Sequence, residues 1–276
     1  MPLSLSQTRE ILQRLSHQPR KQLGQNFLVD GNIVRKSIEL AKLKPGEPVV
    51  EVGPGLGTLT RTLLEAGAQV WAVEHDRQLA EFLRAEVGGF ADDRFNLLEA
   101  DAVTAPRAGL PDELADAGFK IVANLPYAIS TPWLDAIMRG PLPERMVLML
   151  QWEAAQRYMA SSGTKQFGAI SIFLQSAYII EPGHRVAASC FHPPPEVESY
   201  LLNISRRPDP FVFLPAVRDL IRRCFQQRRK QVQSLLRGRL PDDGRAWLST
   251  LAEEQLDGRA RPEQIPTKAW QRLTVA

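Results

Sequence analysis

The chain has 276 residues, of which 44% are hydrophobic and 24% are charged. This composition is typical of a globular protein with one large domain, or with a medium and a small one, and it excludes a disordered or fibrous chain. The longest charge-free run near the middle, residues 166–180, is too short and too polar to span a bilayer. We therefore expect no membrane segment.

The N-terminus and the cysteines bear on location and on metal binding. Arg9, Glu10 and Arg14 stand where a secretory signal would have its apolar core. Cys190 and Cys224 are too few for a disulfide framework, and neither has a neighbouring Cys or His at zinc-binding spacing. These features predict a cytoplasmic protein that holds no metal.

In chain order, residues 1–30 form a basic lead-in with a possible short helix carrying Ile11, Leu12 and Leu15. Residues 31–206 alternate between helical and extended patterns, which predicts an α/β domain with a mostly parallel sheet and helices on both faces. The expected helices cover residues 32–43, 58–65, 79–87, 131–139 and 153–161, and the expected strands cover residues 49–52, 69–74, 95–98, 120–123, 146–150, 178–186 and 199–205.

Residues 207–276 differ in pattern and in charge. Arg207, Pro208 and Pro210 indicate a linker, and apolar residues at three-to-four spacing beyond it predict a small all-helical C-terminal domain. The net charge of the chain is only +3, yet residues 206–245 contain eleven Arg and Lys and four Asp and Glu. Such a block indicates either a surface that faces a polyanion or a solvated helix face.

Three features predict a cofactor site at one edge of the sheet. A strand runs into the glycine turn Gly53–Pro54–Gly55–Leu56–Gly57, where the backbone can bend sharply and approach a ligand. Glu74 ends the next strand, where a carboxylate can accept hydrogen bonds from ribose hydroxyls. Asp101 follows the third strand. Its carboxylate can accept a hydrogen bond from an adenine amine, or it can cap the N-terminus of a helix. The turn has no third glycine at the G-x-G-x-x-G spacing of a pyrophosphate loop, which favours S-adenosylmethionine over NAD.

The fourth strand ends in Asn124–Leu125–Pro126–Tyr127. The exocyclic amine of adenine is a poor nucleophile, because its lone pair is delocalised into the ring. The Asn124 side-chain oxygen and a backbone carbonyl, held in place by Pro126, could accept from its two N–H groups and free that lone pair. Tyr127 could stack on the purine. The motif therefore predicts methylation of the adenine amine.

Together with two further segments, these motifs resemble the KsgA-type family of small-subunit (16S) ribosomal RNA adenine dimethyltransferases. The resemblance rests on motifs in the family's order and spacing, and it runs from about Lys21 to about Leu236. The motifs are Leu23–Gly24–Gln25–Asn26–Phe27–Leu28, Gly53–Pro54–Gly55–Leu56–Gly57, Asn124–Leu125–Pro126–Tyr127 and Phe191–His192–Pro193–Pro194–Pro195–Glu196–Val197–Glu198–Ser199.

The resemblance implies a class I S-adenosylmethionine-dependent methyltransferase fold, Rossmann-like, with a helical rRNA-binding domain. It implies that Asn26 and Leu28 close over the cofactor, that Asn124 also contacts it, and that Phe191 stacks on a flipped adenine. The implied substrate is two adjacent adenosines in the 3′-terminal hairpin loop of small-subunit rRNA in the immature subunit, each dimethylated. We expect a monomer.

The sequence departs from the family pattern at two positions. Leu23 stands where an aromatic residue is frequent, and Ala128 stands where bacterial members commonly have Asn. Neither change removes a group assigned to chemistry. In the basic block, Arg218, Arg222 and Arg229 are expected on one helix face, and Arg228, Arg229 and Lys230 are expected to contact phosphates.

Several other functions stay open from the sequence. A large-subunit rRNA adenine methyltransferase of the antibiotic-resistance type would share the fold and the catalytic motif. A DNA adenine methyltransferase is less well supported, because no sequence-reading module is evident. The intact motifs argue against a purely non-enzymatic ribosome-assembly factor or mitochondrial transcription factor, though not against a second role. An NAD-dependent dehydrogenase would need a pyrophosphate loop and an acid/base pair, which are not found.

Overall fold

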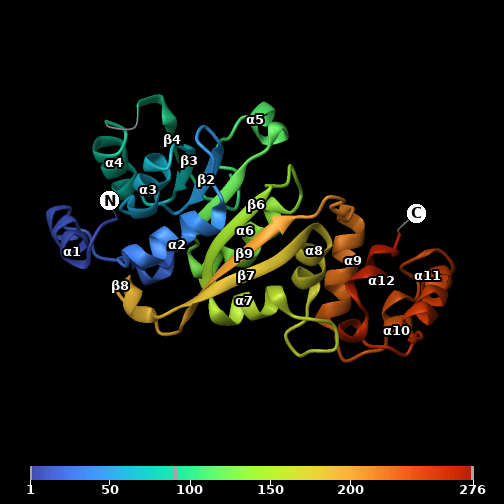
Figure 1. Cartoon of the computed structure of the whole chain (residues 1–276). Helices are drawn as coiled ribbons and strands as arrows, with labels where there is room; N and C mark the ends of the chain where they lie inside the picture. Colours follow the sequence, from blue (N-terminus) through green and yellow to red (C-terminus); the bar gives the residue numbers. More distant parts are fainter. Residues whose placement is uncertain (1, 90–91, 275–276) are drawn as a thin grey trace. The chain divides into compact units, whose positions relative to one another are not determined.

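The computed structural model describes residues 2–89 and 92–274 (Figure 1). Contacts divide the chain into two compact units. Unit 1 comprises Met1–Trp152 and Ile180–Arg206, and unit 2 comprises Glu153–Ile179 and Arg207–Ala276. The chain therefore passes between the units three times, and each unit is described by itself below.

Unit 1 contains a mostly parallel seven-stranded sheet with the order β4-β3-β2-β5-β6-β9-β7. Strands β2 to β6 run parallel, and β9 pairs antiparallel with β6. The strands are β2 (Pro48–Val52), β3 (Gln69–Glu74), β4 (Phe95–Glu99), β5 (Lys120–Asn124), β6 (Arg145–Gln151), β7 (Tyr178–Val186, which begins in unit 2) and β9 (Ser199–Arg206). All seven lie within a residue of their predicted bounds, and the buried parallel strands β2, β3, β5 and β6 are near-continuous apolar runs.

The strand order creates a topological switch point. From β2 the chain winds outward to β3 and β4, then returns to β5 on the other side of β2. The loops that leave β2 and β5 therefore diverge and open a crevice at the carboxyl ends of these strands, where open α/β sheets bind their ligands. Both sequence motifs, the glycine turn and Asn124, lie at this point.

Helices and short 3₁₀ turns connect the strands of unit 1 (Figure 1). The side chain of Asp30 accepts hydrogen bonds from the backbone of Asn32 and Ile33 and so begins α2, and Asp76 begins α4 in the same way. The sequence did not predict α5, since six residues carry too little periodicity. The helices are α1 (Leu5–Arg14), α2 (Gly31–Ala41), α3 (Thr58–Glu65), α4 (Arg77–Glu86), α5 (Asp112–Ala117) and α6 (Ser130–Ile137), with 3₁₀ turns at Lys21–Leu23, Asp92–Arg94, Tyr127–Ile129 and Ala188–Cys190.

A separate two-stranded ladder joins distant parts of unit 1. Strand β1 (Phe27–Leu28) pairs antiparallel with β8 (Phe191–His192), so that Leu28 lies opposite Phe191. Phe27, Leu28 and Phe191 are buried in the same hydrophobic cluster. Strand pairing between segments this far apart has no local sequence signal, and the ladder was not predicted.

Unit 2 is helical. Helix α8 packs against α9 and α12, and ring contacts join Phe167 to Phe225, Phe225 to Trp270, and Trp270 to Trp247. The helices are α7 (Trp152–Met159, with its first residue in unit 1), α8 (Ala169–Ala177), α9 (Pro215–Gln226), α10 (Val232–Leu236), α11 (Arg245–Thr250) and α12 (Thr267–Gln271), with 3₁₀ turns at Pro241–Gly244, Leu251–Glu254 and Pro262–Gln264.

The contact units differ from the predicted domains in one segment. The linker at residue 207 coincides with a unit boundary, but residues 153–179 belong with the C-terminal helices instead of with the 31–206 domain. The reason is the apolar surface of α8, where the ring of Phe173 packs 5.5 Å from that of Phe213. Helix α8 is apolar on nearly every side and so carries little amphipathic periodicity, which explains why the sequence did not predict it.

Candidate active site

A cavity of about 200 Å³ lies in unit 1 at the carboxyl ends of β2, β3 and β5. Its wall combines these strand ends with the N-terminal segment 22–28. It brings together eight of the predicted site residues: Asn26, Leu28, Gly53, Gly55, Glu74, Asp101, Asn124 and Pro126. Three others, Leu125, Tyr127 and Phe191, are not part of this wall.

The glycine turn is packed tightly from two sides. Gly53 has φ +66°, and a Cβ there would lie 3.3 Å from the Pro126 ring. Gly55 has φ +59°, and a Cβ there would lie 3.1 Å from the ring of Phe27. Both positions thus require glycine for conformation and for space. The turn leaves its backbone close to the cavity, with the N-terminal segment packed against it.

Glu74 is fixed at the cavity wall. Its Oε2 accepts a hydrogen bond from the Gly55 backbone at 3.0 Å, and its Oε1 accepts one from the Asp76 backbone at 2.9 Å. The residue is only 6% exposed, and burial raises its pKa above the ordinary value. Each carboxylate oxygen keeps a further lone pair, so the group can accept from the two hydroxyls of a ribose.

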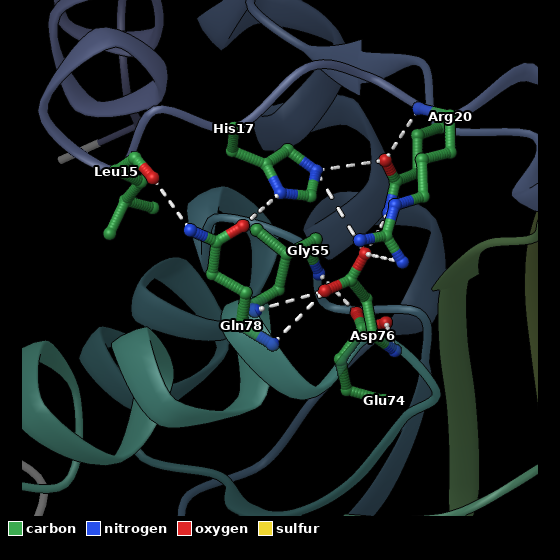
Figure 2. A network of polar contacts seen from close by, with 9 residues as sticks. Leu15, His17, Arg20, Gly55, Glu74, Asp76 and Gln78 are labelled. Carbon is green, nitrogen blue, oxygen red and sulfur yellow. Dashed lines mark hydrogen bonds and ion pairs between the residues drawn. The ribbon is translucent and has the colours of Figure 1, made fainter.

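Behind Glu74, a buried network ties the N-terminal segment to the start of α4 (Figure 2). The side chain of Asp76 is 1% exposed. Its Oδ2 accepts from Gln25 Nε2 at 3.1 Å and pairs with Arg20 at 3.3 Å. The sequence analysis did not single out these residues, because they are scattered along the chain and each looks ordinary alone.

His17 completes this network (Figure 2). Its Nδ1 lies 2.8 Å from Oε1 of Gln78, and its Nε2 lies 3.0 Å from Oε1 of Gln25. Gln78 also donates to the Leu15 carbonyl at 2.6 Å. The segment that lines the cavity is therefore held by hydrogen bonds as well as by the β1–β8 ladder.

Asp101 borders the cavity but is partly committed to its own turn. Its Oδ1 accepts from the Val103 backbone at 2.8 Å. No helix begins at Asp101, so the helix-capping role that the sequence analysis considered is not realised, and the carboxylate lines the cavity. An adenine amine can use the remaining acceptor capacity of the carboxylate.

Glu51 is a site residue that the sequence analysis missed. It lines the cavity at the end of β2 and is 1% exposed. Burial, with a smaller contribution from Glu74, raises its pKa to about 8. Within the described residues its Oε2 has no hydrogen-bond partner. A buried carboxylate with an unpaired oxygen beside a cavity favours a cationic ligand, and the sulfonium and ammonium groups of S-adenosylmethionine fit that requirement.

The Asn124 amide is oriented by the N-terminal segment. Its Nδ2 donates to the Asn26 carbonyl at 2.9 Å, so Oδ1 remains as an acceptor. The Pro126 carbonyl accepts from Ile129 at 3.1 Å. The carbonyl of Leu125 is therefore the better candidate for the second acceptor of the motif. The side chain of Leu125 is buried and serves packing.

The two expected aromatic clamps differ in their surroundings. The hydroxyl of Tyr127 lies 2.6 Å from Oγ of Ser199, and burial raises its pKa. Phe191 is 3% exposed and is part of the hydrophobic cluster that also contains Phe27 and Leu28 of β1. Its burial matches that of a loop anchor, and its stacking on adenine stays a prediction.

In unit 2, the basic block is arranged differently from the expectation. Helix α9 ends at Gln226, so Arg229 does not continue its face. Arg218 is 4% exposed, and its guanidinium lies 4.5 Å from the centre of the Phe173 ring. The predicted common face of Arg218, Arg222 and Arg229 was therefore wrong, because the helix stops early and Arg218 packs inward.

Two observations concern other kinds of site. Across residues 2–89 and 92–274, no helix is long and apolar enough to cross a membrane. The same residues contain no group of three or more His, Cys, Asp or Glu side chains that could hold a metal ion.

The switch-point cavity, with its glycine turn, buried Glu74 and Asn–Leu–Pro–Tyr motif, defines a class I S-adenosylmethionine-dependent methyltransferase. The chain belongs to the Ribosomal RNA adenine dimethylase family, whose model matches residues 16–272. It is 64% identical to the Ribosomal RNA small subunit methyltransferase A of Opitutus terrae, over 100% of this chain and 99% of the relative. The protein of that name from Lactobacillus johnsonii is 36% identical over 96% of this chain and 93% of its own.

Two solved structures have the same fold. A dimethyladenosine transferase from Plasmodium falciparum matches with a TM-score of 0.73 and 22% identity, over 88% of this chain and 94% of that one. The 23S rRNA methyltransferase ErmE matches with a TM-score of 0.66 and 27% identity, over 90% of this chain and 97% of that one. The predicted fold class, family and cofactor are thereby confirmed.

Proposed function

We propose that this protein transfers methyl groups from S-adenosylmethionine to the exocyclic amines of two adjacent adenosines in the 3′-terminal hairpin loop of small-subunit rRNA. The observation that carries this proposal is the oriented Asn124 amide at the edge of a cavity that fits the cofactor. The 64% identity to a relative named as a small-subunit methyltransferase supports the choice of RNA.

Different residues of the cavity wall would contact different parts of S-adenosylmethionine. Glu74 would accept from the ribose hydroxyls, and Asp101 would accept from the adenine amine of the cofactor. Glu51 would face its positive groups. Asn26 and Leu28 would hold the N-terminal segment over it. The cofactor supplies an activated methyl group on a sulfonium, so these residues need only bind and orient it.

The catalytic motif would act on the amine of the target. Oδ1 of Asn124 and the carbonyl of Leu125 would accept its two hydrogens and so localise the nitrogen lone pair. Pro126 would keep the turn rigid, and Tyr127 would stack on the base while Ser199 holds its hydroxyl. No strong base is needed, because the proton is lost to water after attack.

Extracting the adenine from its loop would require aromatic contacts. We assign one to Tyr127 and the second to Phe191, which would have to become accessible when RNA binds. We further propose a monomeric, cytoplasmic enzyme that acts during small-subunit biogenesis, with residues 207–276 as the main rRNA-binding part.

Methyl transfer to undermethylated small and large subunits, mapped by reverse transcription, tests the proposal. Dimethylation blocks Watson–Crick pairing, so two adjacent stops near the 3′ end of small-subunit RNA are expected. A stop in large-subunit RNA would instead indicate the resistance-type activity suggested by the similarity to ErmE. Cofactor binding without transfer to either subunit would indicate an assembly factor without this activity.

A further inference from the structure

The buried ring of His17 has an oxygen atom facing each of its two nitrogens (Figure 2). Nδ1 lies 2.8 Å from Oε1 of Gln78, at the start of α4. Nε2 lies 3.0 Å from Oε1 of Gln25, in the segment that lines the cofactor cavity. The side chain of His17 is only 1% exposed, so water does not take the place of either contact.

Neither glutamine amide can turn to present its nitrogen to the ring. Oε1 of Gln25 also accepts from the backbone N–H of Arg20 at 2.8 Å, while Nε2 of Gln25 donates to Oδ2 of Asp76 at 3.1 Å. A rotated amide would place two donors together at Arg20 and two acceptors together at Asp76. Nε2 of Gln78 donates to the Leu15 carbonyl at 2.6 Å, so rotation there would bring two oxygens together.

The two fixed oxygens require a ring that donates from both nitrogens. A neutral imidazole has one N–H and one bare nitrogen, and the bare nitrogen would face an oxygen lone pair at hydrogen-bond distance. The doubly protonated ring satisfies both oxygens, and its positive charge strengthens both hydrogen bonds. The buried carboxylate of Asp76, 3.9 Å from Nε2, supplies the opposite charge, which it shares with the exposed Arg20. The geometry thus matches His17 as a buried imidazolium.

Gln25 links the ring to two groups of the cavity. One link runs through Asp76, whose backbone N–H donates to Oε1 of Glu74 at 2.9 Å. The other runs through the next residue of the chain, Asn26, whose carbonyl accepts from Nδ2 of Asn124 at 2.9 Å. The position of Gln25 therefore bears both on the carboxylate assigned to the ribose and on the direction in which Oδ1 of Asn124 points.

Gln78 belongs to a different path. Its side chain joins the ring to the Leu15 carbonyl at the end of α1, and it is not part of the cavity wall. Loss of this side chain would loosen the tie between α1 and α4 and leave the contacts of Gln25 with Arg20 and Asp76 in place. The two glutamines thus separate an effect on the cavity from an effect on the fold.

We propose that His17 is a positioning residue for methyl transfer. Its doubly protonated ring donates to Gln25 and Gln78, and it thereby holds residues 22–28 in the geometry that binds S-adenosylmethionine and directs the Asn124 amide. His17 does not line the cavity, so it acts through Gln25. The effect on Asn124 rests on the proposed function, whereas the effect on the cofactor rests on the methyltransferase class alone.

A double-mutant cycle in the full-length protein tests this route. His17→Phe keeps a ring and removes both donors, Gln25→Met removes the amide, and the third variant combines the two. Calorimetry measures the affinity for S-adenosylmethionine, and methyl transfer to undermethylated small subunits gives kcat and the KM for the subunit.

Each single variant should weaken cofactor affinity and lower kcat by about tenfold, because buried oxygens lose their donors, while the KM for the subunit stays unchanged. The double variant should lose little more than Gln25→Met alone, since the two residues act in series. Losses that multiply in the double variant would mean independent roles and would overturn the proposal.

Gln78→Met is the matched control, because it removes an amide from the same ring on the side away from the cavity. Both glutamine variants should lower the melting temperature, but Gln78→Met should change cofactor affinity and kcat less than about twofold. Equal losses in the two variants would show that the ring only stabilises the fold. This comparison remains decisive if His17→Phe does not fold.

Nitrogen-15 NMR of the wild type with bound S-adenosylmethionine tests the state of the ring directly. The His17 ring should carry a proton on both nitrogens, and a ring with one bare nitrogen would overturn the proposal. Because NMR and calorimetry do not measure methyl transfer, they also separate this proposal from the proposed function. A wild type with the expected ring and cofactor affinity that did not methylate subunits would count against the proposed function alone.

Discussion

The cofactor cavity of unit 1 and a basic hollow of unit 2 show opposite ways of preparing a binding surface. The hollow is lined by the exposed cations Arg223, Lys230, Arg237 and Arg239. In the cavity, several polar side chains are already held by other parts of the protein, as Glu74 is held by the backbones of Gly55 and Asp76. In the hollow, no ion pair within the described part of the chain joins these cations to an acidic group. A pre-organised wall suits a small ligand bound in one orientation, whereas exposed charges suit a flexible polyanion whose affinity depends on salt.

The largest expected effect tests whether the cavity is catalytic and not merely a binding site. Asn124→Ala should lower kcat for methyl transfer by about 10²–10³-fold, because the amine loses a fixed acceptor. Affinity for S-adenosylmethionine, measured by calorimetry, should change much less. Asn96→Ala, on the exposed side of β4, is the control and should leave kcat unchanged. A cofactor affinity that fell as steeply as kcat would assign Asn124 to cofactor binding.

The second prediction concerns the ribose contact. Glu74→Gln should weaken the affinity for S-adenosylmethionine by about 10–100-fold, since hydrogen bonds to a charged acceptor contribute about 1.5–3 kcal/mol. Subunit binding in the absence of cofactor should be unaffected, which separates the cavity from the hollow. The assignment fails if equilibrium binding of the cofactor to the variant matches that of the wild type.

The third prediction uses the raised pKa of Glu51. A cationic ligand favours the carboxylate, so cofactor affinity should rise about tenfold per pH unit between pH 6 and 7 and level off above pH 8. Glu51→Gln should remove this dependence. Without ligand the sign is reversed: the folded protein holds the proton more tightly than the unfolded chain, so the free energy of unfolding should fall as pH rises from about 4.5 to about 8. A wild-type affinity independent of pH would contradict the role of Glu51.

The smallest expected effect comes from comparing a paired arginine of unit 2, Arg228, with an unpaired one, Arg237. Arg228 is paired with Glu263 and bonded to the Lys165 carbonyl, so Arg228→Gln should lower the free energy of unfolding by about 0.5–1.5 kcal/mol. Its effect on the salt dependence of subunit binding should be smaller than that of Arg237→Gln. Denaturant unfolding and salt titration measure the two quantities. A larger salt effect for Arg228→Gln than for Arg237→Gln would instead assign the phosphate contacts to Arg228 and its neighbours, as the sequence analysis expected.

The predictable part of this protein is the part in which neighbouring residues carry the signal. Strands β2, β3 and β5 are apolar runs; the glycine turn follows the first of them, and Glu74 and Asn124 end the other two. Because parallel strands end at one edge of a sheet, their order along the chain suffices to gather these residues. The sequence alone thus determined the fold class, the cofactor and the main members of the cavity wall.

Tertiary structure decided the features that depend on contacts between distant segments. The pKa of Glu51 is raised because the folded protein buries its side chain at the cavity, and its position in the sequence of β2 does not reveal this. Pairing of β1 with β8 buries Phe191, and packing of α8 draws residues 153–179 into unit 2. In the basic block, the sequence fixes the number of charges, but only the early end of α9 and the placement of carboxylates decide which of them face solvent without a partner.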